Sequence, residues 1–174
     1  MILVPVAAAT IVAVDADNQV SIDRFLKNGC SLSEMEDRYV IHFRLYPAKK
    51  AQDHEKVSQL MRQFVPQAYT LTQEYQEDFG GGFTPGLYSR YTDGEGHTVR
   101  LTSNQPLSGK LIIYKDGCTA TEISYMGYDM VLVEWEDARE IHWLDDEEGL
   151  RYSVYADGLT ERQFWDLVFE IARS

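Results

Sequence analysis

The sequence predicts an α+β fold: an antiparallel, curved sheet built as a strand meander, with one mid-chain helix and one C-terminal helix packed on it. Three observations lead to this prediction. Short alternating segments recur at regular spacing from residue 71 onward, turn residues separate them, and two apolar helical stripes flank the series. Strands so closely spaced must pair antiparallel, because a parallel neighbour needs a long crossover. The predicted strands cover residues 71–76, 87–92, 98–103, 110–114, 119–124, 130–135, 140–144 and 150–156.

One further strand is predicted earlier in the chain, over residues 39–46. Tyr39, Ile41 and Phe43 alternate with His42 and Arg44, which is typical of a half-buried strand. The alternation predicts that His42 faces solvent, and the same reasoning is applied to His142 in the strand 140–144. The polar segment 31–37 is predicted to be a loop or turn, and 19–27 a weak strand or short helix.

Both helices are predicted from apolar residues at helical spacing. The mid-chain helix covers 48–64 and ends before Pro66, because the residue preceding a proline avoids helical geometry. The C-terminal helix covers 160–173 and starts with a capping box, in which Thr160 and Gln163 each satisfy a free backbone N–H group. The stripes consist of Val57, Leu60, Met61, Phe64 and Val65 in the first helix, and of Phe164, Leu167, Val168 and Ile171 in the second, with Trp165 and Phe169 beside them.

The length of 174 residues fits one domain. We expect it to cover residues 19–174, after an apolar N-terminal segment, 1–18. The first fourteen residues read MILVPVAAATIVAV. They suit the end of a membrane segment or a buried strand better than a complete signal peptide, since no basic stretch precedes them.

The formal net charge of −12 limits the classes of partner. Phosphate backbones and anionic membrane surfaces would repel such a chain, so nucleic-acid binding is not expected. A cationic partner remains compatible with this charge. The sequence also contains no cofactor-binding motif, and we expect no cofactor and no metal site.

Two cysteines, Cys30 and Cys118, lack the spacing of a zinc site. They fit either two buried thiols or a disulfide, and a disulfide requires an oxidising compartment. Both alternatives stay open at this point.

No catalytic constellation emerges from the sequence. The run Gly80-Gly81-Gly82 lacks the ending of a phosphate-binding loop, and the acidic turns lack calcium-loop spacing. None of the four histidines, His42, His54, His97 and His142, accompanies a recognisable nucleophile motif. Ten aromatic residues could line a groove, although cross-strand packing is the commoner role. They are Tyr39, Phe43, Tyr88, Tyr91, Tyr125, Tyr128, Trp135, Trp143, Tyr152 and Tyr155.

Residues 65–174 carry a series of short motifs in a familiar order. They are Val65-Pro66-Gln67-Ala68-Tyr69, Tyr91-Thr92-Asp93-Gly94-Glu95-Gly96, Gly127-Tyr128, Ile141-His142-Trp143, Tyr152-Ser153-Val154, Gly158-Leu159-Thr160 and Ile171-Ala172-Arg173-Ser174. Together they resemble an uncharacterised bacterial domain family. That family commonly forms the extracytoplasmic C-terminal part of Gram-positive, membrane-anchored proteins that are anti-sigma-factor-like or sporulation-related. This chain departs from the pattern at Ala68, where glycine is usual, and at Gln163, where an acidic residue is common.

The resemblance implies a non-enzymatic, extracytoplasmic sensory or protein-interaction module, held near the membrane in the full-length protein. It assigns no catalytic residues. Two other hypotheses are a carrier that binds a small molecule or lipid between the sheet and a helix, and a hydrolase with an unrecognised site. The partner is expected to be a protein or a small ligand. Accessible loops are the expected interaction surface, namely Phe83 and the acidic turn of Asp145, Asp146, Glu147 and Glu148.

Overall fold

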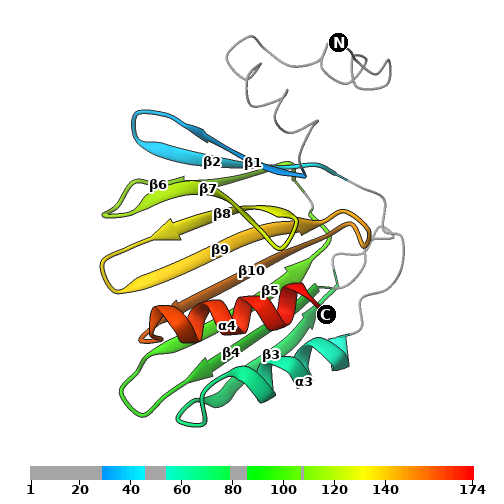
Figure 1. Cartoon of the computed structure of the whole chain (residues 1–174), viewed down its shortest axis with the longest axis vertical. Coiled ribbons are helices and arrows are strands. Elements are labelled where there is room, and N and C mark those ends of the chain that lie inside the picture. Colours follow the sequence, from blue (N-terminus) through cyan, green and yellow to red (C-terminus); the bar gives the residue numbers. More distant parts are fainter. Residues whose placement is uncertain (1–28, 46–53, 79–85, 107) are drawn as a thin grey trace.

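The protein is represented by a computed structural model that describes residues 29–45, 54–78, 86–106 and 108–174. The described part holds ten strands in two antiparallel sheets and two helices (Figure 1). The predicted α+β class with an antiparallel sheet is therefore confirmed. The predictions for the N-terminal segment 1–18, for 19–27 and for Phe83 concern residues outside the described ones.

The larger sheet has seven strands in the order β3-β4-β5-β10-β9-β8-β7. Each strand lies within a residue or two of its predicted bounds, because turn residues and alternation both mark the strand ends. The strands are β3 (Thr70–Glu77), β4 (Gly86–Thr92), β5 (Thr98–Asn104), β7 (Thr119–Tyr125), β8 (Tyr128–Glu134), β9 (Ala138–Asp145) and β10 (Leu150–Asp157).

The smaller sheet has three strands in the order β1-β2-β6. These are β1 (Cys30–Glu34), β2 (Arg38–Phe43) and β6 (Lys110–Tyr114). The predicted loop over 31–37 is thus wrong for its first half. Leu32 pairs with Ile41 and shares the buried face with Cys30, whereas Ser31 and Ser33 alternate to the other side. Serine in this segment hides a strand from composition-based reasoning, because only every second residue needs to be apolar.

The large sheet is buried on both faces over part of its width, and two apolar clusters result. Met130 and Leu132 belong to the cluster on the helix side. Val131 and Val133 alternate to the opposite face and join the cluster beneath the small sheet. The small sheet therefore packs on the β7–β9 region of the face that the helices do not use.

Helices α3 (His54–Phe64) and α4 (Glu161–Ala172) lie on the same face of the large sheet (Figure 1). The predicted start of the first helix, over 48–53, lies outside the described residues. In α4 the predicted capping box is present: Gln163 N donates to Thr160 Oγ1, and Thr160 N donates to Gln163 Oε1. The predicted stripe of four α4 residues is buried, and Phe169 stays 39% exposed.

Two histidines correct the sequence prediction. His42 and His142 were expected on solvent-facing positions, but they are only 3% and 2% exposed. His42 lies on the outer face of the small sheet, and His142 lies beneath that sheet beside Phe43. The alternation predicted which residues share a face. It did not reveal that a second sheet covers the polar face of β9.

Candidate binding site at the end of the large sheet

Two pockets flank the turn between β8 and β9. The helix-side pocket, of about 570 Å³, reaches Leu159 and Phe164 of the α4 region. The back pocket, of about 560 Å³, opens toward Arg100 and Tyr155 on the opposite face. Both pockets share one wall, which consists of Trp135, Glu136, Asp137, Ala138 and Asp157. The turn therefore separates the two pockets at one end of the sheet.

The helix-side pocket has an excess of unpaired negative charge. Glu136 and Asp137 are exposed at the turn, and neither carboxylate takes part in an ion pair or hydrogen bond within the described residues. Arg139, in contrast, is paired: its Nε lies 3.5 Å from Glu134, and its guanidinium lies 4.0 Å from Glu161. The two free carboxylates lie next to Trp135, whose indole packs partly against the inter-sheet cluster.

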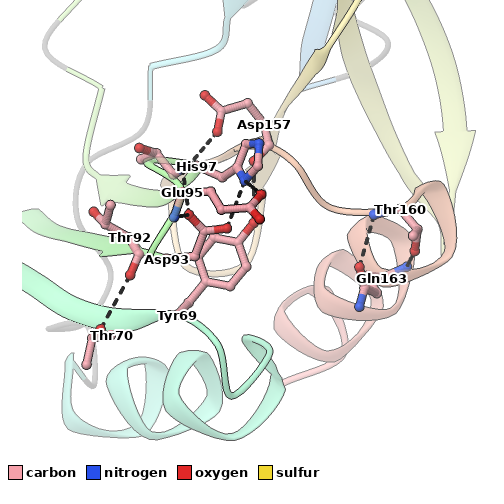
Figure 2. A network of polar contacts seen from close by, with 10 residues as sticks. Tyr69, Thr70, Thr92, Asp93, Glu95, His97, Asp157, Thr160 and Gln163 are labelled. Carbon is pink, nitrogen blue, oxygen red and sulfur yellow. Dashed lines mark hydrogen bonds and ion pairs between the residues drawn. The ribbon is translucent and has the colours of Figure 1, made fainter.

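Asp157 fixes the geometry of the shared wall. Its Oδ1 accepts a 2.6 Å hydrogen bond from the backbone N–H of Thr98, and its Oδ2 accepts one from the Tyr155 hydroxyl at 3.0 Å. The Tyr69 hydroxyl donates to its backbone carbonyl at 3.5 Å. Figure 2 shows Asp157 and Tyr69 beside the capping box of α4. Asp157 thus ties the end of β10 to β5 and is occupied by internal bonds.

His97 borders the helix-side pocket as part of a tight turn. Its Nδ1 lies 2.8 Å from Asp93 Oδ2, while Asp93 Oδ1 accepts the backbone N–H groups of Glu95 and His97 (Figure 2). The hydrogen bond to Asp93 raises the pKa of His97 above its usual value. Partial burial raises the pKa of Asp93, but the hydrogen bonds from His97 and Glu95 outweigh this effect, and the pKa is lowered. The ring also lies against Gly158, where an added Cβ would come within 2.5 Å of His97 Cγ.

Asp93, Glu95 and His97 each place a potential metal-ligating atom within 4.8 Å of the others. The internal hydrogen bonds of this turn already explain the arrangement, because both oxygens of Asp93 accept bonds from its own loop. The turn is therefore a folding element that borders the pocket.

The back pocket combines a cation, an aromatic ring and a half-buried carboxylate. The Arg100 guanidinium lies 4.2 Å from the centre of the Tyr155 ring, and Trp135 meets the same ring edge-on at 6.3 Å. Burial raises the pKa of Glu140, against the lowering effect of Arg100 and Arg151. Arg100 is the cation of this pocket, and the exposed carboxylates of Glu136 and Asp137 border it as they border the helix-side pocket.

His142 lies deeper in the same face, behind Glu140. Glu140 Oε1 is 3.4 Å from His142 Nε2, and neither ring nitrogen has a hydrogen-bond partner among the residues that the structure describes. Burial, with a further contribution from Arg151, lowers the pKa of His142 to about 3. The ring is therefore neutral at physiological pH, and no hydrogen bond joins it to a nucleophile within the described residues.

The two cysteines are free and buried in the cluster between the sheets. Cys118 Sγ donates a 3.4 Å hydrogen bond to the carbonyl of Tyr114. Burial raises the pKa of both thiols, so neither presents a thiolate.

One serine–histidine contact was not predicted from the sequence. Ser33 Oγ lies 2.9 Å from His42 Nε2 across β1 and β2. Burial lowers the pKa of His42, and the charge of Lys110 lowers it further. A general base must become an imidazolium, and this environment disfavours that state. In the described part of the chain no carboxylate orients the ring, so the pair lacks the third member of a catalytic triad.

The predicted acidic interaction loop lies at the other end of β9 from the pockets. Asp145 Oδ1 accepts the N–H groups of Glu147 and Glu148, and its Oδ2 accepts the Tyr128 hydroxyl. Glu148 accepts the Tyr152 hydroxyl at 2.8 Å. An added Cβ at Gly29 would lie 2.5 Å from Asp146 Oδ1, so Asp146 is packed against the chain entering β1. These carboxylates build the turn, and Glu147 is left as an exposed charge. Trp135 and Tyr155 are among the ten aromatic residues that the sequence offered as able to line a groove, and both border pockets. No local pattern separates these two from the other eight.

Comparison with known proteins returns no match among family models, curated proteins or solved structures. Within the described residues, no helix has the length and apolar character needed to cross a membrane.

Proposed function

We propose that this chain is a non-enzymatic binding domain, a sensory or protein-interaction module, that recognises a cationic side chain of a partner protein at the helix-side pocket. One observation carries the proposal. The carboxylates of Glu136 and Asp137 are unpaired beside Trp135, whereas the cationic Arg139 and His97 at the same pocket already have acidic partners.

A lysine or arginine side chain suits this arrangement physically. Its charge can pair with the two exposed carboxylates, while its alkyl stem and charged head pack along the indole of Trp135. The net charge of −12 adds long-range attraction for a basic partner and accelerates its encounter with the domain. The pocket volume of about 570 Å³ accommodates one such side chain.

The chemistry of the described nucleophiles supports binding over turnover. Both thiols are buried and protonated, the imidazole of His142 is sealed from solvent, and the Ser33–His42 pair is disfavoured as a base. The described helix–sheet interface is filled by side chains such as Leu167 and Val168, which are 1% and 0% exposed. That packing favours an interaction module over a carrier with an apolar groove between helix and sheet. An extracytoplasmic, membrane-proximal setting, as the family resemblance implies, belongs to the same proposal.

The test uses charge-neutral isosteres at the pocket. The double variant Glu136→Gln, Asp137→Asn removes both charges from an exposed turn and keeps its shape. Titration of the intact chain with a lysine-rich hexapeptide, followed by NMR of the tryptophan indole resonances, should give saturable binding that the variant weakens about tenfold. A tenfold loss corresponds to about 1.4 kcal/mol, the size of one charge-assisted contact.

The matched control is Glu147→Gln, which removes an exposed charge from the acidic turn at the other end of the sheet. It should bind the peptide as the native protein does. An equal loss in this control would show that only overall charge attracts the peptide, and it would refute recognition at the pocket. So would unchanged binding of the same peptide with acetylated lysines.

A further inference from the structure

A different region of the large sheet carries a second inference. On the face opposite the helices, the small sheet covers β7 to β9 but its apolar cluster includes no residue of β3, β4 or β5. Side chains of these strands that alternate away from the helix-side core therefore form a surface of their own. We call it the open face, defined by Gln73, Tyr75, Tyr88, Arg90, Arg100 and Thr102.

Strand register places two cations directly opposite each other on the open face. Arg90 pairs with Arg100 across β4 and β5, between Gln73 on one side and Tyr155 on the other. Like charges at directly opposed positions destabilise a sheet. Neither guanidinium forms an ion pair within the described residues. Arg100 rests on the Tyr155 ring, and Glu140, which pairs with Tyr155 in the strand register, interacts with Arg100 electrostatically without an ion pair. In a chain with net charge −12, this pair of arginines is an anomaly that an anionic group would relieve.

The row beside the arginines is aromatic and polar. Tyr75 stacks on Tyr88 with ring centres 4.9 Å apart, and Tyr75 remains 39% exposed. The Gln73 amide and the Thr102 hydroxyl can each donate and accept hydrogen bonds, and neither group is engaged within the described structure. Aromatic faces next to such groups suit the apolar faces and hydroxyls of a sugar ring.

We propose that the open face binds a sugar that carries a carboxylate, with the carboxylate between Arg90 and Arg100 and the ring on the tyrosine row. A short acidic oligosaccharide carries few charges, so it avoids most of the repulsion that this acidic chain exerts on a long polyanion. The opposed guanidinium groups select the carboxylate. The amide and the hydroxyl contact the ring hydroxyls.

The experiment measures calorimetric binding of trigalacturonate to the intact chain. Its methyl ester and a triglutamate peptide serve as comparison ligands. Native protein should bind trigalacturonate saturably at millimolar concentration. The variant Arg90→Gln should weaken binding about tenfold, and the ester should bind equally weakly. Because the substitution removes one of two opposed like charges, thermal unfolding of Arg90→Gln should occur at an unchanged or higher temperature.

Three controls make the result decisive. Arg162→Gln removes an arginine that is 92% exposed on α4, on the other side of the sheet, and should bind normally. Glu136→Gln, Asp137→Asn should bind trigalacturonate at least as tightly as the native protein, because these carboxylates border the same pocket as Arg100 and repel an anion. This result separates the site from the cation site proposed above. The inference is overturned by absent binding, by undiminished binding to Arg90→Gln or of the ester, or by tighter binding of triglutamate, which would indicate an acidic peptide partner.

Discussion

At the residue scale, the histidines show how strongly position decides chemistry in this chain. His142 and His97 both lie in or beside strands of the large sheet, yet their environments act in opposite directions. Burial lowers the pKa of His142 to about 3, whereas the contact with Asp93 raises the pKa of His97. Arg151, Glu140 and Phe43 face His142 from β10, β9 and β2. Low pH therefore destabilises the fold through His142, whereas protonation of His97 strengthens its contact with Asp93.

His142 predicts a specific loss of stability in mild acid. Its folded pKa lies below the ordinary 6.5, so the unfolded chain binds an extra proton between about pH 6.5 and pH 3. Stability is complete above pH 6.5 and falls by roughly 1.4 kcal/mol per pH unit below it from this group alone. The variant His142→Leu should lack this component, and at pH 7 it should lie within about 1 kcal/mol of the native protein, because the lost ring was unsatisfied.

Urea unfolding of both proteins at pH 7 and pH 5 measures the difference. From pH 7 to pH 5, the free energy of unfolding of the variant should rise by roughly 2 kcal/mol relative to that of the native protein. Only the 1.5 pH units below the ordinary pKa of 6.5 contribute to this difference. His97→Gln is the control of opposite sign. The ion pair of His97 stabilises below pH 6.5 and is lost as the pH rises through its raised pKa. Parallel pH profiles for native protein and His142→Leu would contradict the burial of a neutral imidazole.

At the element scale, α4 is the main cover of the large sheet on the helix side. Its buried stripe consists of Phe164, Leu167, Val168 and Ile171. Phe164 also meets Trp165 edge-on, at 5.4 Å between ring centres. The same helix presents Phe169 to solvent. One element thus offers a buried and an exposed phenylalanine five residues apart, which allows a matched comparison.

We expect Phe164→Ala to reduce the free energy of unfolding by about 3–5 kcal/mol, since the ring is 1% exposed and its loss leaves a cavity. Phe169→Ala should cost less than about 1 kcal/mol, because that side chain is 39% exposed. Chemical denaturation of the two variants gives both values. Equal destabilisation would show that α4 does not pack in the orientation described.

At the scale of the whole molecule, two sheets enclose the cysteines. Cys30 comes from β1 and Cys118 precedes β7, and the exposures of the two residues are 3% and 9%. Both belong to the cluster that joins the sheets. Their reactivity therefore reports on separation of the small sheet from the large one.

We expect two free thiols per chain in protein that is denatured without reductant. In the native state the same thiols should react with a thiol reagent only as fast as the sheets open. The rate should rise with denaturant along with unfolding. If the denatured protein instead contained no titratable thiol, a Cys30–Cys118 disulfide would be established. Rapid reaction of the native protein would show that the small sheet is loosely attached.

Local patterns determined the elements of this protein. Turn residues and alternation located the strands of the large sheet, and Thr160 with Gln163 located the start of α4. These features depend on neighbours a few residues apart, which the sequence displays directly. The first strand escaped because Ser31 and Ser33 occupy its polar side.

Only the tertiary structure decided how the elements combine. In the structure, β6 pairs with β2 instead of joining the meander, and a second sheet covers His142. Arg90 lies opposite Arg100, and Trp135, Glu136 and Asp137 line a pocket. Each of these outcomes depends on register and packing between segments far apart in sequence. Alternation states that two residues share a face, but the free energy of burying one sheet on another decides what that face meets.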